Sequence, residues 1–385
     1  MPNTEPRLDL RTVYDIEIDF AKSHGSFVYD KRTSEQYLDF LNMFSSLPLG
    51  YNHPIFDSSF EKKIINVTKL RMANNLFASS ELLDFKKRFS KYLKHPHLHF
   101  TSTGALAVEA GMKAALYQKK NSDPIFWALD KAFHGINCWG FLTDTYGSTK
   151  PRIDWYPKNK WQNLHLDKMI EVLSNDQEPE NLTGIVVEPI LCTSGDIYLP
   201  SNDLIKLQSL CKNKNISFIV DEIQTGFGPS GEMWYSDRIG LDYDILIFGK
   251  KSQIMGINAS ESYSEAFQSD YRILEVTFDG DLVDAIRSDY ILQAYERDDL
   301  LKKAINRETE IKGLLGPILK NFRAVGNLWA FDFDTPQERD IFCSDCFNKR
   351  LLVNKGGLSS VRMRPNLAVT DSEIEDMYRI IKSVI

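Results

Sequence analysis

The chain has 385 residues, of which 43% are hydrophobic and 26% charged. Its 46 basic and 53 acidic residues give a net charge of −7, which argues against broad binding to nucleic acid or anionic membranes, because both require a basic surface. The sequence has no apolar run of about 18 residues that could cross a bilayer. Residues 1–20 also lack the apolar stretch of a secretory signal, so we expect a cytoplasmic protein.

Short apolar runs alternate with helical patterns through the first two thirds of the chain. The predicted strands are His97–Thr101, Ile125–Leu129, Gly184–Glu188, Phe218–Asp221 and Ile245–Phe248. Small residues between Ala107 and Ala115 recur with helical spacing, and Leu204, Leu207 and Cys211 share one face of a second helix. Buried strands with helices between them favour a mainly parallel α/β sheet.

The C-terminal third has a different pattern, typical of a smaller α+β domain. It contains a predicted long charged helix and two short strands, over about 285–315, 328–333 and 361–364. A last helix opens with a capping box from Thr370 to Glu373. The predicted division is an N-terminal segment that joins the small domain, a large domain and the small domain itself, over residues 1–45, 46–275 and 276–385.

Two short patterns are reminiscent of metal sites. Cys343 and Cys346 form a CxxC, but one such pair supplies only two of the four ligands that a structural zinc requires. We interpret these cysteines as half-buried residues on one face of a helix. His97 and His99 would share one face of a strand, without an identifiable third ligand. We therefore predict no metal site.

Ligands of open α/β sheets bind beyond the carboxyl ends of the strands, and polar residues follow the predicted strands here. Thr103, Gly104 and Ala105 follow the first strand and open a helix, whose free N–H groups and positive dipole end suit a phosphate. Phe133 and His134 place an aromatic ring and an imidazole on the loop after the second strand.

The remaining strand ends carry carboxylates and lysines. Glu188 ends the third strand, Asp221 ends the fourth, and Lys250 and Lys251 follow the fifth. Pyridoxal phosphate needs a lysine for its Schiff base and a carboxylate for its pyridine nitrogen, together with a phosphate cup and an aromatic face. Asp221, Lys250, Phe133 and the residues of the helix start supply one of each. The sequence therefore predicts a pyridoxal phosphate site.

Several stretches between residues 37 and 375 carry a family resemblance. The chain resembles the class III aminotransferases, which are fold-type I pyridoxal phosphate enzymes, and among them the L-lysine 6-aminotransferases. The matching segments are YLDFLNMFSSLPLGYNHP, TGALAVEAGMKAAL, AFHG, TKPRIDWYP, VVEPI, FIVDEIQTGFGPSGEMWY, DILIFGKKSQIMG and SVRMRPNLAVTDSEI. The resemblance implies transfer of an amino group from a lysine-like terminal amine to a keto acid such as 2-oxoglutarate.

The resemblance also implies roles for individual residues. Lys250 matches the Schiff-base lysine, Asp221 the partner of the pyridine nitrogen, and Gln224 the residue that reaches the 3-oxygen of the cofactor. Phe133 matches the ring that stacks on it. Glu188 matches the supporting carboxylate, and Thr103, Gly104 and Ala105 match the phosphate loop. His134 matches the imidazole of the site, and Thr277 matches a threonine from a neighbouring subunit. That threonine implies a homodimer with shared active sites. Lys251 is the rival of Lys250, but strand alternation would point it the other way.

Residues on the substrate side depart from the family pattern. Arg362 matches the arginine that pairs with a substrate carboxylate. Thr193 replaces the glutamate that covers this arginine in lysine and ornithine aminotransferases, and Ile136 replaces an arginine that binds a second carboxylate. Losing such a charged contact costs about 2–5 kcal/mol. We therefore expect a shifted substrate, which is an amine with an apolar group near Ile136 or a specialised or macromolecule-tethered intermediate. The segment Asp279-Gly280-Asp281 also replaces the Gly-Gly-Asn that is usual in the family.

Two other functions remain open. The same fold supports decarboxylation, racemisation and acyl transfer, and only a transaminase requires a keto-acid acceptor. A catalytically silent homologue that serves as a binding subunit is the second alternative. The changes at Ile136 and Thr193 favour it, whereas the presence of both Asp221 and Lys250 favours an enzyme.

Overall fold

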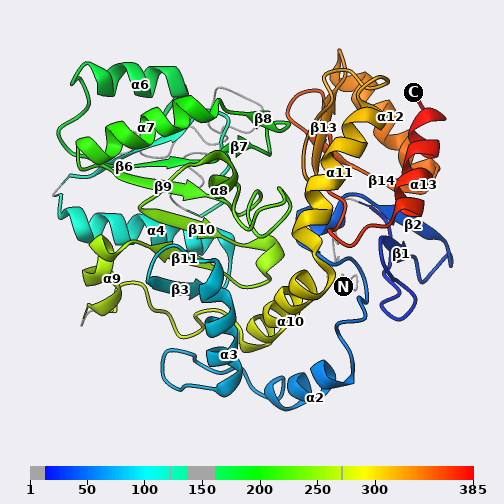
Figure 1. The fold of residues 1–385 in the computed structure, drawn as a ribbon, viewed down its shortest axis with the longest axis horizontal. Helices are drawn as coiled ribbons and strands as arrows, with labels where there is room; N and C mark the ends of the chain where they lie inside the picture. Colours follow the sequence, from blue (N-terminus) through cyan, green and yellow to red (C-terminus); the bar gives the residue numbers. More distant parts are fainter. Residues whose placement is uncertain (1–13, 122, 138–160, 270–271) are drawn as a thin grey trace, which may run out of the picture.

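The computed structural model describes residues 14–121, 123–137, 161–269 and 272–385. It consists of a large unit built on a seven-stranded sheet and a small unit that contains the first strands and the C-terminal elements (Figure 1). Cys138 and the TKPRIDWYP segment lie outside the described residues. Within the described ranges, no helix has the length and apolar character needed to span a membrane.

The sheet of the large unit has the strand order β3-β11-β10-β9-β6-β4-β5. Its strands are β3 (His97–Thr101), β4 (Ile125–Leu129), β5 (Trp161–Leu164), β6 (Leu182–Val187), β9 (Ser217–Asp221), β10 (Ile245–Phe248) and β11 (Met255–Ala259). Only β11 among them is antiparallel to its neighbours, and the pairs from β10 to β5 are all parallel. The mainly parallel α/β sheet is thus confirmed, with small differences at the ends of the predicted strands.

Helices cover both faces of this sheet. The small-residue face of α4 (Gly104–Lys119) packs on one side, and α6 (Leu166–Ser174) and α7 (Ser201–Asn213) pack on the other (Figure 1). In β6, Val186 joins the apolar cluster under α4 and Val187 joins the opposite cluster, because successive side chains alternate across a strand. Burial on both faces explains why these strands are continuous apolar runs in the sequence.

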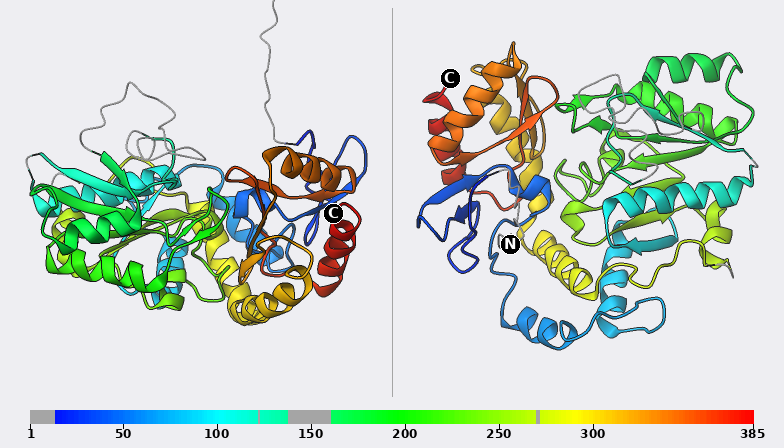
Figure 2. Two further views of the ribbon diagram at one scale, coloured as in Figure 1. Left: turned by 90° about the horizontal axis from the view of Figure 1, so that it is seen from above. Right: turned by 180° about the vertical axis from the view of Figure 1, so that it is seen from behind.

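The small unit combines the two ends of the chain. Its strands are β1 (Phe27–Tyr29), β2 (Gln36–Asp39), β12 (Arg323–Val325), β13 (Leu328–Asp332), β14 (Leu351–Leu352), β15 (Asn354–Gly356) and β16 (Ser360–Met363). β2 pairs in parallel with β14, so the first strands lie beside C-terminal elements (Figure 2). The helices that pack here include α12 (Pro336–Asn348) and α13 (Asp371–Lys382). The predicted capping box of α13, from Thr370 to Glu373, is present.

The predicted single long helix is wrong, because the chain forms two helices there. They are α10 (Leu282–Asp298) and α11 (Leu300–Leu315), separated by Asp299 with a φ of 53°. A residue in this left-handed conformation ends a helix, and aspartate tolerates it better than most side chains do. α10 packs against α3 (Ser80–Phe89), whereas α11 contacts β12 of the small unit. The break therefore lets one charged segment serve both units.

The remaining helices and strands have at most ten residues each. They are α1 (Asn42–Ser45), α2 (Ser58–Val67), β7 (Ile190–Leu191), β8 (Ile197–Tyr198), α8 (Tyr235–Ile239) and α9 (Ser264–Gln268). Cys343 and Cys346 lie on α12 as interpreted from the sequence, but both are buried rather than half-buried. His97 and His99 lie in β3. No group of three or more His, Cys, Asp or Glu side chains that could hold a metal occurs in the described parts of the chain.

Candidate active site

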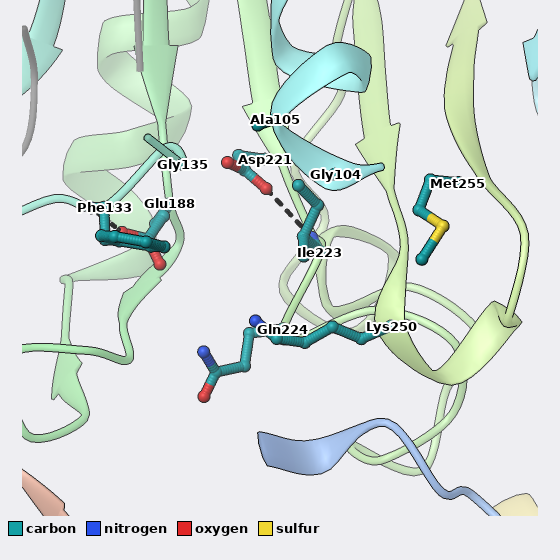
Figure 3. A pocket seen from close by; sticks show the side chains of 10 residues that line it. All are labelled: Gly104, Ala105, Phe133, Gly135, Glu188, Asp221, Ile223, Gln224, Lys250 and Met255. Atoms are coloured by element: carbon teal, nitrogen blue, oxygen red, sulfur yellow. Dashed lines mark hydrogen bonds between the residues drawn. The ribbon is translucent and has the colours of Figure 1, made fainter. Parts of the chain in front are cut away.

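A cavity of about 170 Å³ lies at the carboxyl ends of the parallel strands (Figure 3). It is lined by Gly104, Ala105, Phe133, Gly135, Glu188, Asp221, Ile223, Gln224, Lys250 and Met255. These residues come from the start of α4, the loop after β4 and the ends of β6, β9 and β10, together with the first residue of β11. The structure therefore has a cavity at the edge of the sheet where the sequence predicted a ligand site.

Asp221 is the last residue of β9, and its side chain is held from two directions. The residue is 4% exposed, its Oδ2 lies 2.8 Å from Nδ1 of the buried His134, and its Oδ1 accepts a hydrogen bond from the backbone N–H of Ile223 at 3.0 Å. Burial lowers the pKa of His134, but the hydrogen bond and charge of Asp221 outweigh burial, so the pKa is raised.

Glu188 connects the end of β6 to the aromatic loop. Its Oε1 accepts a hydrogen bond from the backbone N–H of Phe133 at 2.7 Å. Burial raises the pKa of Glu188 to about 7, although the neighbouring His134 opposes this shift. This bond holds the backbone from which the Phe133 ring lines the cavity (Figure 3).

The two adjacent lysines have different surroundings. Both belong to a 3₁₀ turn, Lys250–Ser252, rather than to β10. Lys250 lines the cavity, and burial lowers its pKa although Asp221 opposes this shift. Lys251 is buried outside the cavity, where its Nζ donates a hydrogen bond to the carbonyl oxygen of Gln224. The two side chains therefore do diverge, but in a turn and not by strand alternation.

The predicted phosphate loop is the start of α4. Gly104 and Ala105 line the cavity, and the first N–H groups of a helix have no partners within it. Thr103 is exposed and does not line the cavity, because its hydroxyl caps α4 by accepting a hydrogen bond from the backbone N–H of Leu106 at 3.2 Å. Gly135 has a φ of +94°, and a Cβ there would lie 2.8 Å from that of Ala105.

Arg362 reaches the cavity wall from β16 of the small unit. Its Nη1 donates hydrogen bonds to the carbonyl oxygen of Cys192 at 2.8 Å and to Oε1 of Gln224 at 3.2 Å. Thr193 follows directly on this loop, and its carbonyl oxygen accepts a hydrogen bond from the backbone N–H of Gly357 at 3.1 Å. The structure therefore brings a predicted cofactor residue and a predicted substrate residue into contact.

Ile136 and Thr277 do not line the cavity. Ile136 follows the lining residue Gly135 and is 68% exposed. Thr277 is exposed, on a segment whose next carbonyl oxygen, that of Phe278, accepts a hydrogen bond from the Ser102 hydroxyl at 2.5 Å. This bond places the segment beside the residues that precede α4.

Asp279 and Asp281 both make hydrogen bonds within the chain. The two carboxylate oxygens of Asp279 each lie 3.0 Å from the backbone nitrogen of Val276, which donates to them. Asp281 caps α10 by accepting a hydrogen bond from the backbone N–H of Val283 at 2.8 Å. These aspartates therefore shape the segment that carries Thr277.

The sequence analysis missed Gly135, Ile223 and Met255 as lining residues. Gly135 and Ile223 each adjoin a predicted residue, so their neighbours in AFHG and DEIQ were a usable signal. Met255 lies in the matching segment DILIFGKKSQIMG but adjoins no predicted site residue, and the antiparallel pairing of β11 with β3 and β10 brings it to the cavity.

The residues that line the cavity fit pyridoxal phosphate. A carboxylate held by an imidazole, a lysine, an aromatic ring and a helix start converge on one space (Figure 3). A Cβ on Gly104 would lie 3.0 Å from Cδ1 of Ile223, and one on Gly135 would overlap Ala105. Both glycines thus keep the cavity open near the backbone N–H groups that suit a phosphate.

Comparison with known proteins extends this result over the whole chain. A family model described as aminotransferase class-III matches residues 11–385. The chain is 28% identical to the L-lysine-epsilon aminotransferase of Mycobacterium tuberculosis (strain ATCC 25618 / H37Rv), over 96% of this chain and 92% of that protein. It is 26% identical to the ornithine aminotransferase of Oceanobacillus iheyensis, over 97% of this chain and 94% of that protein.

The fold agrees with the sequence comparison. The lysine aminotransferase from M. tuberculosis, solved in its internal aldimine form, matches with a TM-score of 0.91 and 26% identity, covering 98% of this chain and 96% of that one. Fold type I, pyridoxal phosphate as cofactor and amino transfer as reaction are thereby confirmed. The chain belongs to the class III aminotransferases, pyridoxal phosphate-dependent enzymes that move an amino group from an amine donor to a keto acid.

Proposed function

We propose that the cavity at the carboxyl ends of the strands is the site of amino transfer and that Lys250 is its catalytic lysine. The observation that carries this proposal is the divergence of the two lysines. Lys250 is the one lysine among the described lining residues, whereas the amine of Lys251 is bound to a backbone carbonyl. Because burial lowers the pKa of Lys250, a larger fraction of its amine is neutral and able to accept a proton near pH 7.

The other lining residues would hold the cofactor. Bound pyridoxal phosphate supplies an electron sink for the carbon that loses its proton. Asp221, held by His134, is the proposed partner of the pyridine nitrogen, and Phe133 is the proposed stacking ring. Gln224 faces the 3-oxygen in this proposal, with Glu188 supporting the loop. The start of α4, with Thr103, Gly104 and Ala105, is the proposed binding site of the phosphate.

The substrate assignment rests on three residues around this cavity. Arg362 is the proposed partner of a substrate carboxylate, and the names of the relatives favour a terminal amine as donor. Ile136 leaves an exposed apolar side chain next to the cavity, and Thr193 lacks the charge of a glutamate. We therefore propose a lysine-like amine donor that carries an apolar group near Ile136, with 2-oxoglutarate as the first acceptor to test.

We further propose a cytoplasmic homodimer in which Thr277 reaches the cofactor phosphate of the partner subunit. Exposed apolar side chains gather on two segments, at Leu70, Leu76, Phe77, Val276 and Phe278. The segments adjoin, because Asn75 donates to the carbonyl oxygen of Val276 at 3.2 Å and the Arg71 guanidinium lies 4.4 Å from the centre of the Phe278 ring. Clustered exposed apolar groups favour an interface, and Thr277 lies within this one.

We retain the division of the chain into residues 1–45, 46–275 and 276–385. The pairing of β2 with β14 supports the assignment of the first segment to the small domain.

The visible absorption spectrum of the purified protein with pyridoxal phosphate tests the site assignment. We expect an absorption band that a suitable amine removes and a keto acid restores, beginning with L-lysine and 2-oxoglutarate. Removal by another amine would keep the site and change the donor. The Lys250→Ala variant should lack the band, and the matched Lys251→Ala variant should keep it. The reverse result would contradict the assignment of Lys250.

A further inference from the structure

Lys251 is a buried lysine that the proposed chemistry does not use. Its side chain is 3% exposed, and its Nζ donates a hydrogen bond to the carbonyl oxygen of Gln224 at 2.6 Å. Lysine is almost never fully buried without a partner. Burial lowers the pKa of Lys251 well below its usual range, and the positive charges of Arg364 and Lys250 lower it further. The carbonyl oxygen of Gln224 is therefore a polar partner for this buried amine.

The bond from Lys251 ends the turn that follows β9. The other part of this turn is held by Glu222, whose carboxylate accepts hydrogen bonds from the backbone N–H groups of Tyr235 at 2.7 Å and Ser236 at 2.8 Å. The segment that links Asp221 to Gln224 is thus held at Glu222 and at Gln224. The backbone of Gln224 is thus fixed from outside the cavity that its side chain lines.

The Gln224 side chain lies between two parts of the site. Its Oε1 is 3.2 Å from Nη1 of Arg362 and 3.4 Å from Nη2 of Arg364, both on the small unit. An amide that accepts from an arginine with its oxygen keeps its NH₂ group for an acceptor on the other side. Its placement therefore affects the cofactor side and the substrate side together.

We infer that Lys251 is a positioning residue, which fixes the Gln224 amide between the 3-oxygen of the cofactor and the substrate arginine Arg362. The inference rests on the proposed function, because that function assigns Gln224 to the cofactor and Arg362 to the substrate. Lys251 does not touch either ligand in this scheme. It acts through one hydrogen bond to the backbone of Gln224.

The test uses the holoenzyme and the variants Lys251→Met, Gln224→Ala and their double mutant. Methionine keeps the length and the apolar stem of lysine and removes the donor. Lys119→Met is the matched control, because burial also lowers the pKa of Lys119 and its amine donates to Oδ1 of Asn215 at 2.7 Å, at the far end of α4 from the cavity. The readouts are the pH midpoint of the visible absorption band and the kcat and KM for amine and keto acid.

We expect Lys251→Met to keep the band and to shift its pH midpoint by about half a unit or more, in the same direction as Gln224→Ala. The KM for the keto acid should rise by about threefold or more, because Arg362 loses an oriented partner. In the double mutant the two shifts should not add, since both remove the same placement of one amide. Lys119→Met should leave the midpoint and KM unchanged.

Two results would overturn the inference, and a third would overturn the proposed function on which it rests. A Lys251→Met protein with a wild-type midpoint and only a lower melting temperature would show a purely structural lysine. Additive shifts in the double mutant would show that Lys251 acts without Gln224. Loss of the band in Lys251→Met, with the band kept in Lys250→Ala, would instead overturn the proposed function. If Lys251→Met does not fold, Lys251→Gln restores a donor and should recover the wild-type midpoint.

Discussion

The two sides of the active site are built differently. The proposed cofactor side (His134, Glu188, Asp221 and Lys250) lies at or beyond the carboxyl ends of parallel strands of one sheet. His134 and Asp221 contact each other, and Glu188 accepts a hydrogen bond from the backbone of the Phe133 loop. The substrate side (Ile136, Thr193 and Arg362) consists of two loop residues and one residue from another sheet.

This difference shows where the chain can change without losing its chemistry. A strand end fixes a side chain through the sheet, and a buried carboxylate that loses its donor is costly. Loop residues carry fewer such constraints. On the proposed cofactor side these four residues match the family pattern, whereas two of the three residues on the proposed substrate side, Ile136 and Thr193, depart from it.

Removal of the proposed catalytic lysine should have the largest effect. We expect Lys250→Ala to lower kcat by about 1000-fold or more, because it removes both the covalent attachment and the proton carrier. Lys251→Ala should keep most of the turnover. Single-turnover kinetics with the best amine check this, and comparable losses in both variants would break the division between the two lysines.

Arg362→Ala should have the next largest effect, and only on substrates with a carboxylate. Loss of a buried charged contact costs about 2 kcal/mol or more, which is about 30-fold or more in kcat/KM. Amines without a carboxylate should lose far less. Equal losses for both substrate classes would show that Arg362 supports the fold and does not bind substrate.

Ile136→Arg should move the substrate side towards the family pattern. The new guanidinium offers a second carboxylate contact, so we expect kcat/KM for 2-oxoglutarate to rise about tenfold relative to pyruvate. Ile136→Leu is the control and should leave this ratio unchanged. An unchanged ratio in Ile136→Arg would remove this residue from the substrate side.

Glu188→Gln should act on the stability of the fold, in a way that depends on pH. Burial raises the pKa of Glu188 to about 7 in the folded protein, from an ordinary value of 4.5. The unfolded chain therefore loses this proton first, and wild-type stability falls as the pH rises from about 4.5 to 7. Glutamine does not titrate, so the stability of the variant does not fall in this way. The free energy of unfolding of the variant apoprotein should therefore exceed that of the wild type by about 1–3 kcal/mol at pH 8 and by little at pH 4.5. Urea denaturation at both pH values checks this, and an equal difference at both would refute it.

The large unit was predictable from the sequence because its strands are buried on both faces. The apolar runs before Asp221 and Lys250 marked both the strands and the reactive residues that follow them. The break at Asp299 was not predictable, because aspartate is ordinary in a helix and only the packing of α10 and α11 on different units requires it there. Thr103 was assigned to the phosphate loop from its position, and the sequence did not show that its hydroxyl also caps α4. A hydroxyl that accepts a capping hydrogen bond can still donate its own hydrogen, so the assignment of Thr103 to the phosphate stays a proposal.

The pairing of β2 with β14 sets an order for folding. Leu38 is a neighbour of Leu351 in the sheet, and the Phe40 ring lies in one apolar cluster with residues of α11 and α13. The large sheet needs only residues 97 to 259, so it can form while the ribosome still adds the C-terminal third. β1 and β2 must wait until β14 and α13 have been made before they are buried. During that interval the nascent chain exposes an unpaired strand edge and an apolar surface, which are the features that chaperones bind.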